Sequence, residues 1–402
     1  MSDTEKAYLI LADGTVFEGK AMGARGQTIG ETVFTTGMTG YIETLTDPSY
    51  FGQIVTQTFP LIGNYGVINE DFESKKSYVK GYVVREICDK PSNFRCQGDL
   101  DSFLKEQNIV GICGIDTRKL TKKLREAGVM NGMILSGVES PEETVMPTEE
   151  TVMPNLIRHL TEIRAYKITN AVKSVQQMNL LGEVSPTAST ASPFPPTPSA
   201  GAAPATPPKD MLSVCLFDFG AKANIGRELK KRGCKVTVLP FDTKAEDVIA
   251  LAPDGIMLSN GPGDPAENVG VIVEIRKLCE YGKIPIFGIC LGHQMLALAR
   301  GAKTSKLKYG HRGGNHPVKD LKTDRVYISS QNHGYAVEND SLPTYARLRF
   351  VNSNDGTCEG IEYTDIPAFS VQFHPEACGG PHDTNYLFDL FLEMMENKNA
   401  TK

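Results

Sequence analysis

A short segment of the chain has the residue types of a nucleophilic hydrolase. Residues 288–292 read Gly-Ile-Cys-Leu-Gly, follow an apolar run and precede an apolar helical pattern that begins near Gln294. A sharp turn from a strand into a helix exposes the side chain at its tip, and the glycines remove clashes there. The helix N-terminus favours a thiolate, and the N–H of Leu291 is placed to stabilise a tetrahedral oxyanion. We therefore predict that Cys290 is a nucleophile, with a buried structural cysteine as the alternative.

A nucleophilic thiol needs a base, and a second motif supplies one. His374-Pro375-Glu376 follows an alternating apolar run, residues 369–373, which we expect to be a strand. In an extended chain His374 and Glu376 would project to the same side, and Pro375 would end the strand. His374 would accept the proton of Cys290, and Glu376 would hold the imidazole in the right tautomer. The two motifs together predict a triad of Cys290, His374 and Glu376.

Two other polar segments could line a binding site. Ser259 to Pro265 is rich in glycine and follows an apolar strand pattern, and such a loop at the carboxyl end of a parallel strand often lines a ligand site. A phosphate-binding loop is the alternative, but neither GxxxxGKS/T nor GxGxxG occurs here. Gln331 to Tyr335 is typical of a polar turn when taken alone. Three histidines lack suitably spaced acids, so we interpret them as structural rather than as metal ligands: His293, His311 and His316.

The elements that must position these residues follow an alternating pattern after residue 211. Apolar runs at 212–217, 235–239, 255–259 and 284–289 alternate with helical segments such as 224–232. This pattern predicts a mostly parallel, doubly wound α/β sheet with helices on both faces. The last segment is expected to be an amphipathic helix whose apolar stripe is formed by Leu387, Leu390, Phe391, Met394 and Met395.

The first half of the chain has signals of a separate domain with mixed strands and helices. Asp13-Gly14 between two strand-like runs predicts a hairpin, and Asp116 and Gly128 can cap the two ends of a helix. Residues 184–209 are rich in Pro, Ala, Ser and Thr, so they cannot bury enough apolar surface to fold. We predict domains at 1–182 and 211–402 joined by a linker at 183–210, with a proline-rich recognition motif as the alternative. A short repeat, Glu-Glu-Thr-Val-Met-Pro, within 142–154 is interpreted as a tolerated loop insertion.

The composition excludes several other classes of protein. The chain has 402 residues and a formal net charge of −6, which argues against a nucleic-acid-binding protein. Its nine cysteines form no CxxC pair, so a zinc or thioredoxin-like site has no support and a reducing compartment is expected. The polar start is not a secretory signal, and no run reaches the ~18 apolar residues of a membrane span. We therefore expect a cytoplasmic protein with neither nucleic-acid nor membrane partners.

The motifs resemble those of a known family. The second half resembles class I glutamine amidotransferases through Gly261-Pro262-Gly263, the turn at Cys290 and His374-Pro375-Glu376. Nearly the whole chain resembles the small subunits of carbamoyl phosphate synthetase, in which an N-terminal domain precedes the amidotransferase domain. The matching segments are 31–41, 46–50, 62–66, 114–118, 218–222, 310–317, 331–335 and 380–384. Those in the first half discriminate best, because other class I amidotransferases lack that domain.

This resemblance implies a specific reaction. Small subunits of this family hydrolyse L-glutamine to glutamate and ammonia, and the ammonia passes through an internal tunnel to a large subunit. The large subunit makes carbamoyl phosphate from bicarbonate and ATP for arginine and pyrimidine biosynthesis. ATP, Mg²⁺ and K⁺ bind to the large subunit, so no cofactor or metal is expected in this chain. The glutamine contacts that the resemblance implies are Ser49, Gly261, Gly263, Leu291, Gln294, Asn332, Gly334 and Tyr335.

Departures from the family pattern and two alternatives accompany this hypothesis. The linker is richer in proline than usual, Cys378-Gly379 stands where a small polar residue and Pro are commoner, and Tyr335 stands where Phe also occurs. One alternative is a glutaminase for another synthetase, such as those of the anthranilate or guanylate pathways, and the N-terminal domain opposes it. The other is a non-catalytic regulatory module, which the intact triad opposes.

Overall fold

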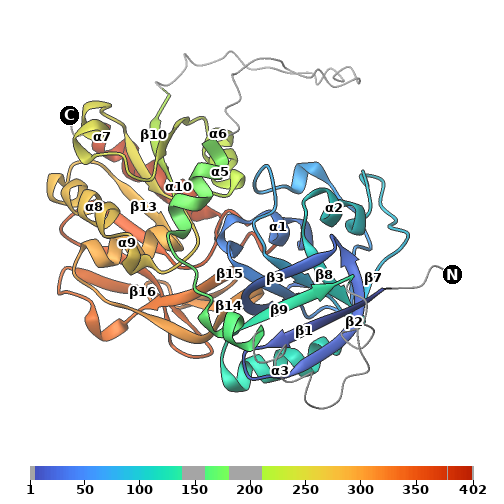
Figure 1. Cartoon of the computed structure of the whole chain (residues 1–402). Coiled ribbons are helices and arrows are strands. Elements are labelled where there is room, and N and C mark those ends of the chain that lie inside the picture. The colour runs from blue at the N-terminus through green and yellow to red at the C-terminus, as the bar shows by residue number, and fades with distance from the viewer. Residues whose placement is uncertain (1–4, 138–158, 181–210, 378, 401–402) are drawn as a thin grey trace, which may run out of the picture.

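The computed structural model describes residues 5–137, 159–180, 211–377 and 379–400. Figure 1 shows two parts side by side, one formed by the first third of the chain and the other by the residues after 211. The proposed linker, the repeat within 142–154 and Cys378 lie outside the described residues. Within the described ranges, no helix has the length and apolar character needed to cross a membrane.

The first part is a closed barrel with helices packed around it. Its strands lie in the order β1-β2-β8-β6-β4-β3-β9, and a two-stranded sheet, β5-β7, lies beside it. The strands are β1 (Lys6–Leu11), β2 (Val16–Gly23), β3 (Gly26–Thr35), β4 (Gln53–Gln57), β5 (Leu61–Ile62), β6 (Gly81–Val83), β7 (Glu86–Ile87), β8 (Val110–Cys113) and β9 (Met130–Ser136). The helices are α1 (Tyr41–Thr46), α2 (Leu100–Glu106) and α3 (Thr117–Ala127).

Two local predictions for this part are confirmed. β1 and β2 pair antiparallel around the Asp13-Gly14 turn, where Gly14 has a φ of 87° that glycine adopts without steric cost. α3 begins after Asp116, whose side chain accepts a hydrogen bond from the N–H of Lys119, and ends at Gly128.

The second part is a nine-stranded sheet in the order β11-β10-β12-β13-β18-β17-β16-β14-β15. Its strands are β10 (Ser213–Asp218), β11 (Lys235–Pro240), β12 (Gly255–Leu258), β13 (Ile286–Ile289), β14 (Thr304–Asp320), β15 (Arg325–Val337), β16 (Ala346–Asn352), β17 (Cys358–Tyr363) and β18 (Ala368–Val371). Its helices are α6 (Ala223–Lys231), α7 (Ala245–Ala250), α8 (Val269–Tyr281), α9 (Leu291–Ala299) and α10 (Tyr386–Ala400). An additional helix, α5 (Ala171–Leu180), precedes the linker.

The predicted parallel, doubly wound sheet is confirmed for the strands from β11 to β18. These strands pair in parallel, and the strands from β18 to β15 extend the sheet by antiparallel pairs. Alternate residues of β10 enter two different cores: Phe217 packs with residues of α7, α8 and α9, whereas Leu216 packs with α6 and α10. Helices therefore cover both faces, as continuous apolar strands require.

The β14–β15 ribbon brings the two parts together, and in Figure 1 it runs toward the barrel. The N–H of Thr36 donates to the carbonyl oxygen of Arg312 at 3.2 Å, and the N–H of Val129 donates to that of Lys308 at 2.9 Å. Lys306 pairs with Glu31 across the same boundary. The barrel and the ends of β12 and β13 therefore face a common space, where the motifs singled out in the sequence meet.

Candidate active site

Cys290 lies at a strained turn between β13 and α9. Its φ of 52° and ψ of −102° fall in a region that a residue with a side chain rarely adopts and that costs on the order of 1–3 kcal/mol. The surroundings hold this turn in place: the Cys290 N–H donates to the carbonyl oxygen of Val371 at 2.9 Å, and that of Gly292 donates to Ser259 at 3.0 Å. A β-carbon at Gly292 would lie 2.3 Å from the carbonyl oxygen of Leu258, so only glycine fits there. The predicted turn from strand to helix is therefore present.

His374 and Glu376 form a direct, fully buried pair. Nδ1 of His374 lies 2.7 Å from Oε1 of Glu376, and neither side chain is exposed to solvent. The expected geometry was wrong in one respect: β18 ends at Val371, so the pair does not project from an extended strand. The chain turns instead, and the N–H of Ala377 donates to the carbonyl oxygen of His374 at 3.3 Å. The motif lies in a turn because β18 ends at Val371, before His374 is reached.

The electrostatics of the pair favour a protonated imidazole. Burial raises the pKa of Glu376, but His374 and then Lys222 outweigh it and lower this pKa to about 2. Burial and Lys222 lower the pKa of His374, but Glu376 and Cys290 together raise it to about 10. Nε2 of His374 has no hydrogen-bond partner within the described residues, although Cys290 lies near enough to raise the pKa of the ring. This nitrogen is therefore available for proton exchange with the thiol and with a substrate.

Charged residues from both domains surround the pair. Lys222 is buried, and its Nζ lies 3.5 Å from Oε1 of Glu376 and 3.5 Å from Oδ2 of Asp47. The same oxygen of Asp47 accepts a hydrogen bond from Nδ2 of Asn332 at 3.0 Å. The backbone oxygen of Asn332 in turn lies 3.7 Å from Sγ of Cys290, which donates to it. A continuous path of contacts thus runs from the thiol to the imidazole through Asp47 of the first domain.

Sequence reasoning did not single out Asp47, Lys222, Asn260 or Glu73. Asn260 links the domains, because its Nδ2 donates to Oγ of Ser49 at 2.9 Å and its Oδ1 accepts from the N–H of Lys222 at 3.0 Å. Glu73 accepts from the backbone N–H of Asn224 at 3.2 Å. Asp47, Asn260 and Lys222 lie inside sequence motifs that were recognised, and membership of those motifs could have indicated them. Glu73 lies outside every recognised motif, so no sequence pattern indicated its role.

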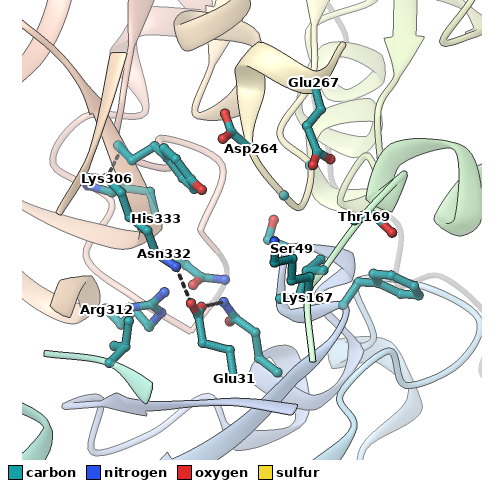
Figure 2. A pocket seen from close by; sticks show the side chains of 18 of the residues that line it. Glu31, Ser49, Lys167, Thr169, Asp264, Glu267, Lys306, Arg312, Asn332 and His333 are labelled. Carbon is teal, nitrogen blue, oxygen red and sulfur yellow. Dashed lines mark hydrogen bonds and ion pairs between the residues drawn. The ribbon is translucent and has the colours of Figure 1, made fainter. Parts of the chain in front are cut away.

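A cavity of about 430 Å³ opens beside Cys290 between the two domains. Figure 2 shows that side chains of both domains point into it, including Glu31 and Ser49 from the barrel and Arg312 and Asn332 from the β14–β15 ribbon. The implied glutamine contacts that line it are Ser49, Gly261, Gly263, Gln294, Asn332, Gly334 and Tyr335.

Leu291 is the implied contact that does not line this cavity. Its side chain is 1 % exposed and packs in the core. Leu291 is the first residue of α9, and the N–H of a first helical residue has no acceptor within the helix. Its contribution would therefore come from the backbone, next to the Cys290 thiol.

A second cavity, of about 380 Å³, reaches the charged residues around the triad. Asp47, Lys222 and Asn332 line it together with Gly379 and Gly380. Asn332 belongs to the walls of both cavities. The first cavity is therefore open to Cys290, whereas the second is lined by Asp47 and Lys222 and not by Cys290.

The remaining histidines have structural environments, with one correction. His293 bonds to Oγ of Ser370 at 2.8 Å, and burial lowers its pKa to about 3, so it is a neutral core residue. The expectation that His311 lacks suitable acids was wrong: Asp355 lies 2.9 Å and Glu359 3.4 Å from its ring nitrogens. These acids come from after β16 and from β17, so sequence spacing did not reveal them. His311, Glu359 and His333 are near enough to one another to hold a metal ion. Burial lowers the pKa of His311, but Glu359 and Asp355 outweigh it and raise this pKa.

Comparison with known proteins places the chain in a family. Residues 9–134 match the family model of the carbamoyl-phosphate synthase small chain, CPSase domain, and residues 215–394 match that of class-I glutamine amidotransferases. Over the whole length, the chain is similar to proteins named carbamoyl phosphate synthase small chain. The one from Listeria monocytogenes is 50 % identical over 394 residues, which cover 98 % of both chains.

Two further relatives carry the same name. The protein from Bacillus cereus is 50 % identical over 98 % of this chain and 96 % of its own. The protein from Fusobacterium nucleatum is 48 % identical over 97 % of this chain and 98 % of its own. Since both domains match and the similarity spans the barrel, the sheet and the site between them, the chain belongs to the carbamoyl phosphate synthase small chain family.

Proposed function

We propose that this chain hydrolyses L-glutamine to glutamate and ammonia with Cys290, His374 and Glu376 as its catalytic triad. The observation that supports this best is the strained Cys290 turn beside the buried His374–Glu376 pair, at a cavity lined by the implied glutamine contacts. Class-I glutamine amidotransferase is the family model that this half of the chain matches.

The proposed reaction needs one proton carrier and one nucleophile. The Cys290 thiolate attacks the carboxamide carbon of glutamine, and the backbone N–H of Leu291 stabilises the oxyanion that forms. His374 gives its proton to the leaving nitrogen, which departs as ammonia and leaves a glutamyl thioester on Cys290. Water then loses a proton to His374 and attacks the thioester carbon, which releases glutamate and restores the thiolate. Glu376 stabilises the imidazolium in both halves of the reaction.

The ammonia is delivered to a large subunit that makes carbamoyl phosphate from bicarbonate and ATP. The name of the relatives, a small chain of carbamoyl phosphate synthase, supports such a partner. The second cavity is a suitable beginning for the ammonia path, because it shares the wall residue Asn332 with the cavity beside Cys290. The product would serve arginine and pyrimidine biosynthesis, and the cofactors ATP, Mg²⁺ and K⁺ would bind to the large subunit rather than to this chain.

Replacement of the nucleophile tests the proposal. In a complex with the large subunit, Cys290→Ser should reduce glutamine-dependent synthesis of carbamoyl phosphate by roughly a thousandfold or more. Synthesis from free ammonia should remain, because that route bypasses the thiol. Cys96→Ser is a matched control, since Cys96 lies in the first domain between β7 and α2 and its thiol donates to the carbonyl oxygen of Gly98. Unchanged use of glutamine by Cys290→Ser would rule out the assigned nucleophile.

A further inference from the structure

We infer that Asp47 is a positioning residue that couples the nucleophile to its base, so that the barrel domain is part of the glutaminase site. This inference rests on the proposed function. Asp47 itself does not touch the reacting atoms: it lies between α1 and the helical turn Pro48–Tyr50, and its action on the triad passes through two neighbours.

The Asp47 carboxylate is held rigidly in the space between the domains. The residue is 3 % exposed, and its Oδ1 accepts the N–H of Ser49 at 2.9 Å. This bond fixes the orientation of the carboxylate and leaves the second oxygen directed at the sheet domain. The orientation of the Asp47 carboxylate is therefore set within its own turn and does not depend on the triad.

The second oxygen, Oδ2, has one partner on each side of the triad. Nδ2 of Asn332 lies at 3.0 Å, and the backbone oxygen of Asn332 contacts Sγ of Cys290 at 3.7 Å. Nζ of Lys222 lies 3.5 Å from the same oxygen and 3.5 Å from Glu376. One oxygen of the barrel thus holds a neighbour of the nucleophile and a neighbour of the base.

The charge of Asp47 also limits a competition at Glu376. Nδ1 of His374 and Nζ of Lys222 both approach the same oxygen of Glu376, Oε1, at 2.7 Å and 3.5 Å. Asp47 attracts the Lys222 ammonium away from this oxygen. Without that attraction Lys222 would compete with His374 for Glu376, and its positive charge would disfavour the imidazolium. When a buried charge such as the Lys222 ammonium loses one partner, its interactions with the remaining partners change strongly, because water does not replace the lost partner.

An isosteric substitution removes this effect with little change in volume. In Asp47→Asn, one amide oxygen can still accept the N–H of Ser49, but the NH₂ group then faces two donors, Asn332 Nδ2 and Lys222 Nζ. We expect kcat for glutamine hydrolysis to fall by roughly ten- to a hundredfold, which is the loss in rate that corresponds to a lost hydrogen bond to a charged group. KM should change less, because Asp47 does not line the glutamine cavity.

The matched control is Glu18→Gln, the same change of carboxylate to amide in the same domain. Glu18 forms an exposed pair with Lys6, where such pairs contribute little. Both variants are assayed in the full complex with the large subunit, for glutamine-dependent and for ammonia-dependent synthesis. The control should match the unaltered protein in both assays, and Asp47→Asn should lose only the first.

The pH dependence distinguishes positioning from a general loss of structure. Lys222 lowers the pKa of His374, and this influence grows when Asp47 no longer neutralises the ammonium. The basic limb of the kcat profile, where His374 loses the proton that it gives to ammonia, should therefore move to lower pH in Asp47→Asn. The charged or titratable groups that interact with Asp47 are Lys222, Glu73 and Tyr50, and Glu376 in turn faces Lys222. They are unchanged in this variant.

A double-mutant cycle gives the decisive measurement. If Asp47 acts through Lys222, then Asp47→Asn combined with Lys222→Gln should lose less kcat than the product of the two single losses. Losses that multiply, or a pH profile of Asp47→Asn equal to that of Glu18→Gln, would overturn the inference. Failure of the proposed function is distinguishable, because the unaltered complex would then release no ammonia from glutamine.

Discussion

Oε1 of Glu376 is the residue-scale centre of the site, because two cations approach this one buried atom. His374 and Lys222 both reach it, and together they lower the pKa of Glu376 to about 2 against the opposing effect of burial. The stabilising contribution of such a carboxylate is present above its unfolded pKa, about 4.5, and is lost as the pH falls toward its folded pKa. His374 behaves in the opposite sense: with a pKa raised to about 10, its contribution is present below about 6.5 and is lost as the pH rises.

Glu376→Gln should therefore destabilise the protein in a pH-dependent way. Removal of one member of a buried pair costs about 3–5 kcal/mol, and the largest difference is expected between about pH 4.5 and pH 6.5, where both groups contribute. The free energy of unfolding in urea, measured for both proteins from acid to alkaline pH, gives this difference directly. The difference in the free energy of unfolding should become smaller below and above that pH range. A difference that is constant with pH would show that the His374–Glu376 pair does not cause the loss of stability.

At the scale of single elements, the close contact between α9 and β12 determines the turn that the chain forms at Cys290. α9 approaches β12 so closely that a β-carbon on Gly292 would lie 2.3 Å from a backbone oxygen of Leu258. Gly292→Ala should therefore lose about 1–3 kcal/mol of stability, because a backbone atom cannot move aside, and should also disturb the Cys290 turn. Thermal unfolding and glutaminase activity both measure this effect.

Gly226→Ala is the matched control for that prediction. Gly226 lies inside α6, where a β-carbon would meet no atom within 4 Å. Alanine at an open helical position gains roughly 0.5–1 kcal/mol over glycine, so this variant should be slightly more stable than the unaltered protein. Equal losses in the two variants would contradict the proposed role of close approach at Gly292.

The elements show why one part of the site could be predicted from sequence and another could not. The turn at Cys290 is local: two glycines, an apolar strand and a helix stand next to one another in the chain, and each has a physical reason. The His374–Glu376 pair was also found, although the chain turns where an extended strand was expected. Asp47 and Lys222 are different, because a charged residue in a polar segment has the same sequence pattern whether it is buried or solvated. Only the packing of the two domains brings them together.

At the scale of the whole molecule, each domain has its own hydrophobic cores. The clusters that include Leu9 or Tyr82 contain barrel residues, whereas those that include Phe217 or Phe287 lie in and around the sheet. Within the described residues, no cluster joins the barrel strands to the sheet, although Val172 of α5, which precedes the linker, packs in the core of the sheet domain. The catalytic site is the opposite case, since it takes residues from both parts.

This division predicts how the sheet domain should behave alone. Residues 211–402, produced without the barrel, should show a cooperative thermal transition but a value of kcat/KM for glutamine that is lower by roughly a hundredfold or more, because Ser49 and Asp47 are missing. Circular dichroism and ammonia release measure the two properties, and residues 1–182 added in excess should restore part of the activity. Full activity of the isolated sheet domain would contradict a shared site.

The path of contacts from Cys290 through Asn332, Asp47, Lys222 and Glu376 to His374 has a consequence for evolution. Recombination that joined the barrel of one lineage to the sheet of another would pair position 47 of the first with position 222 of the second, and a mismatch there would disturb the site even where every triad residue was inherited intact. The two halves are therefore expected to be inherited together, and substitutions at positions 47 and 222 to be accepted as compensating pairs.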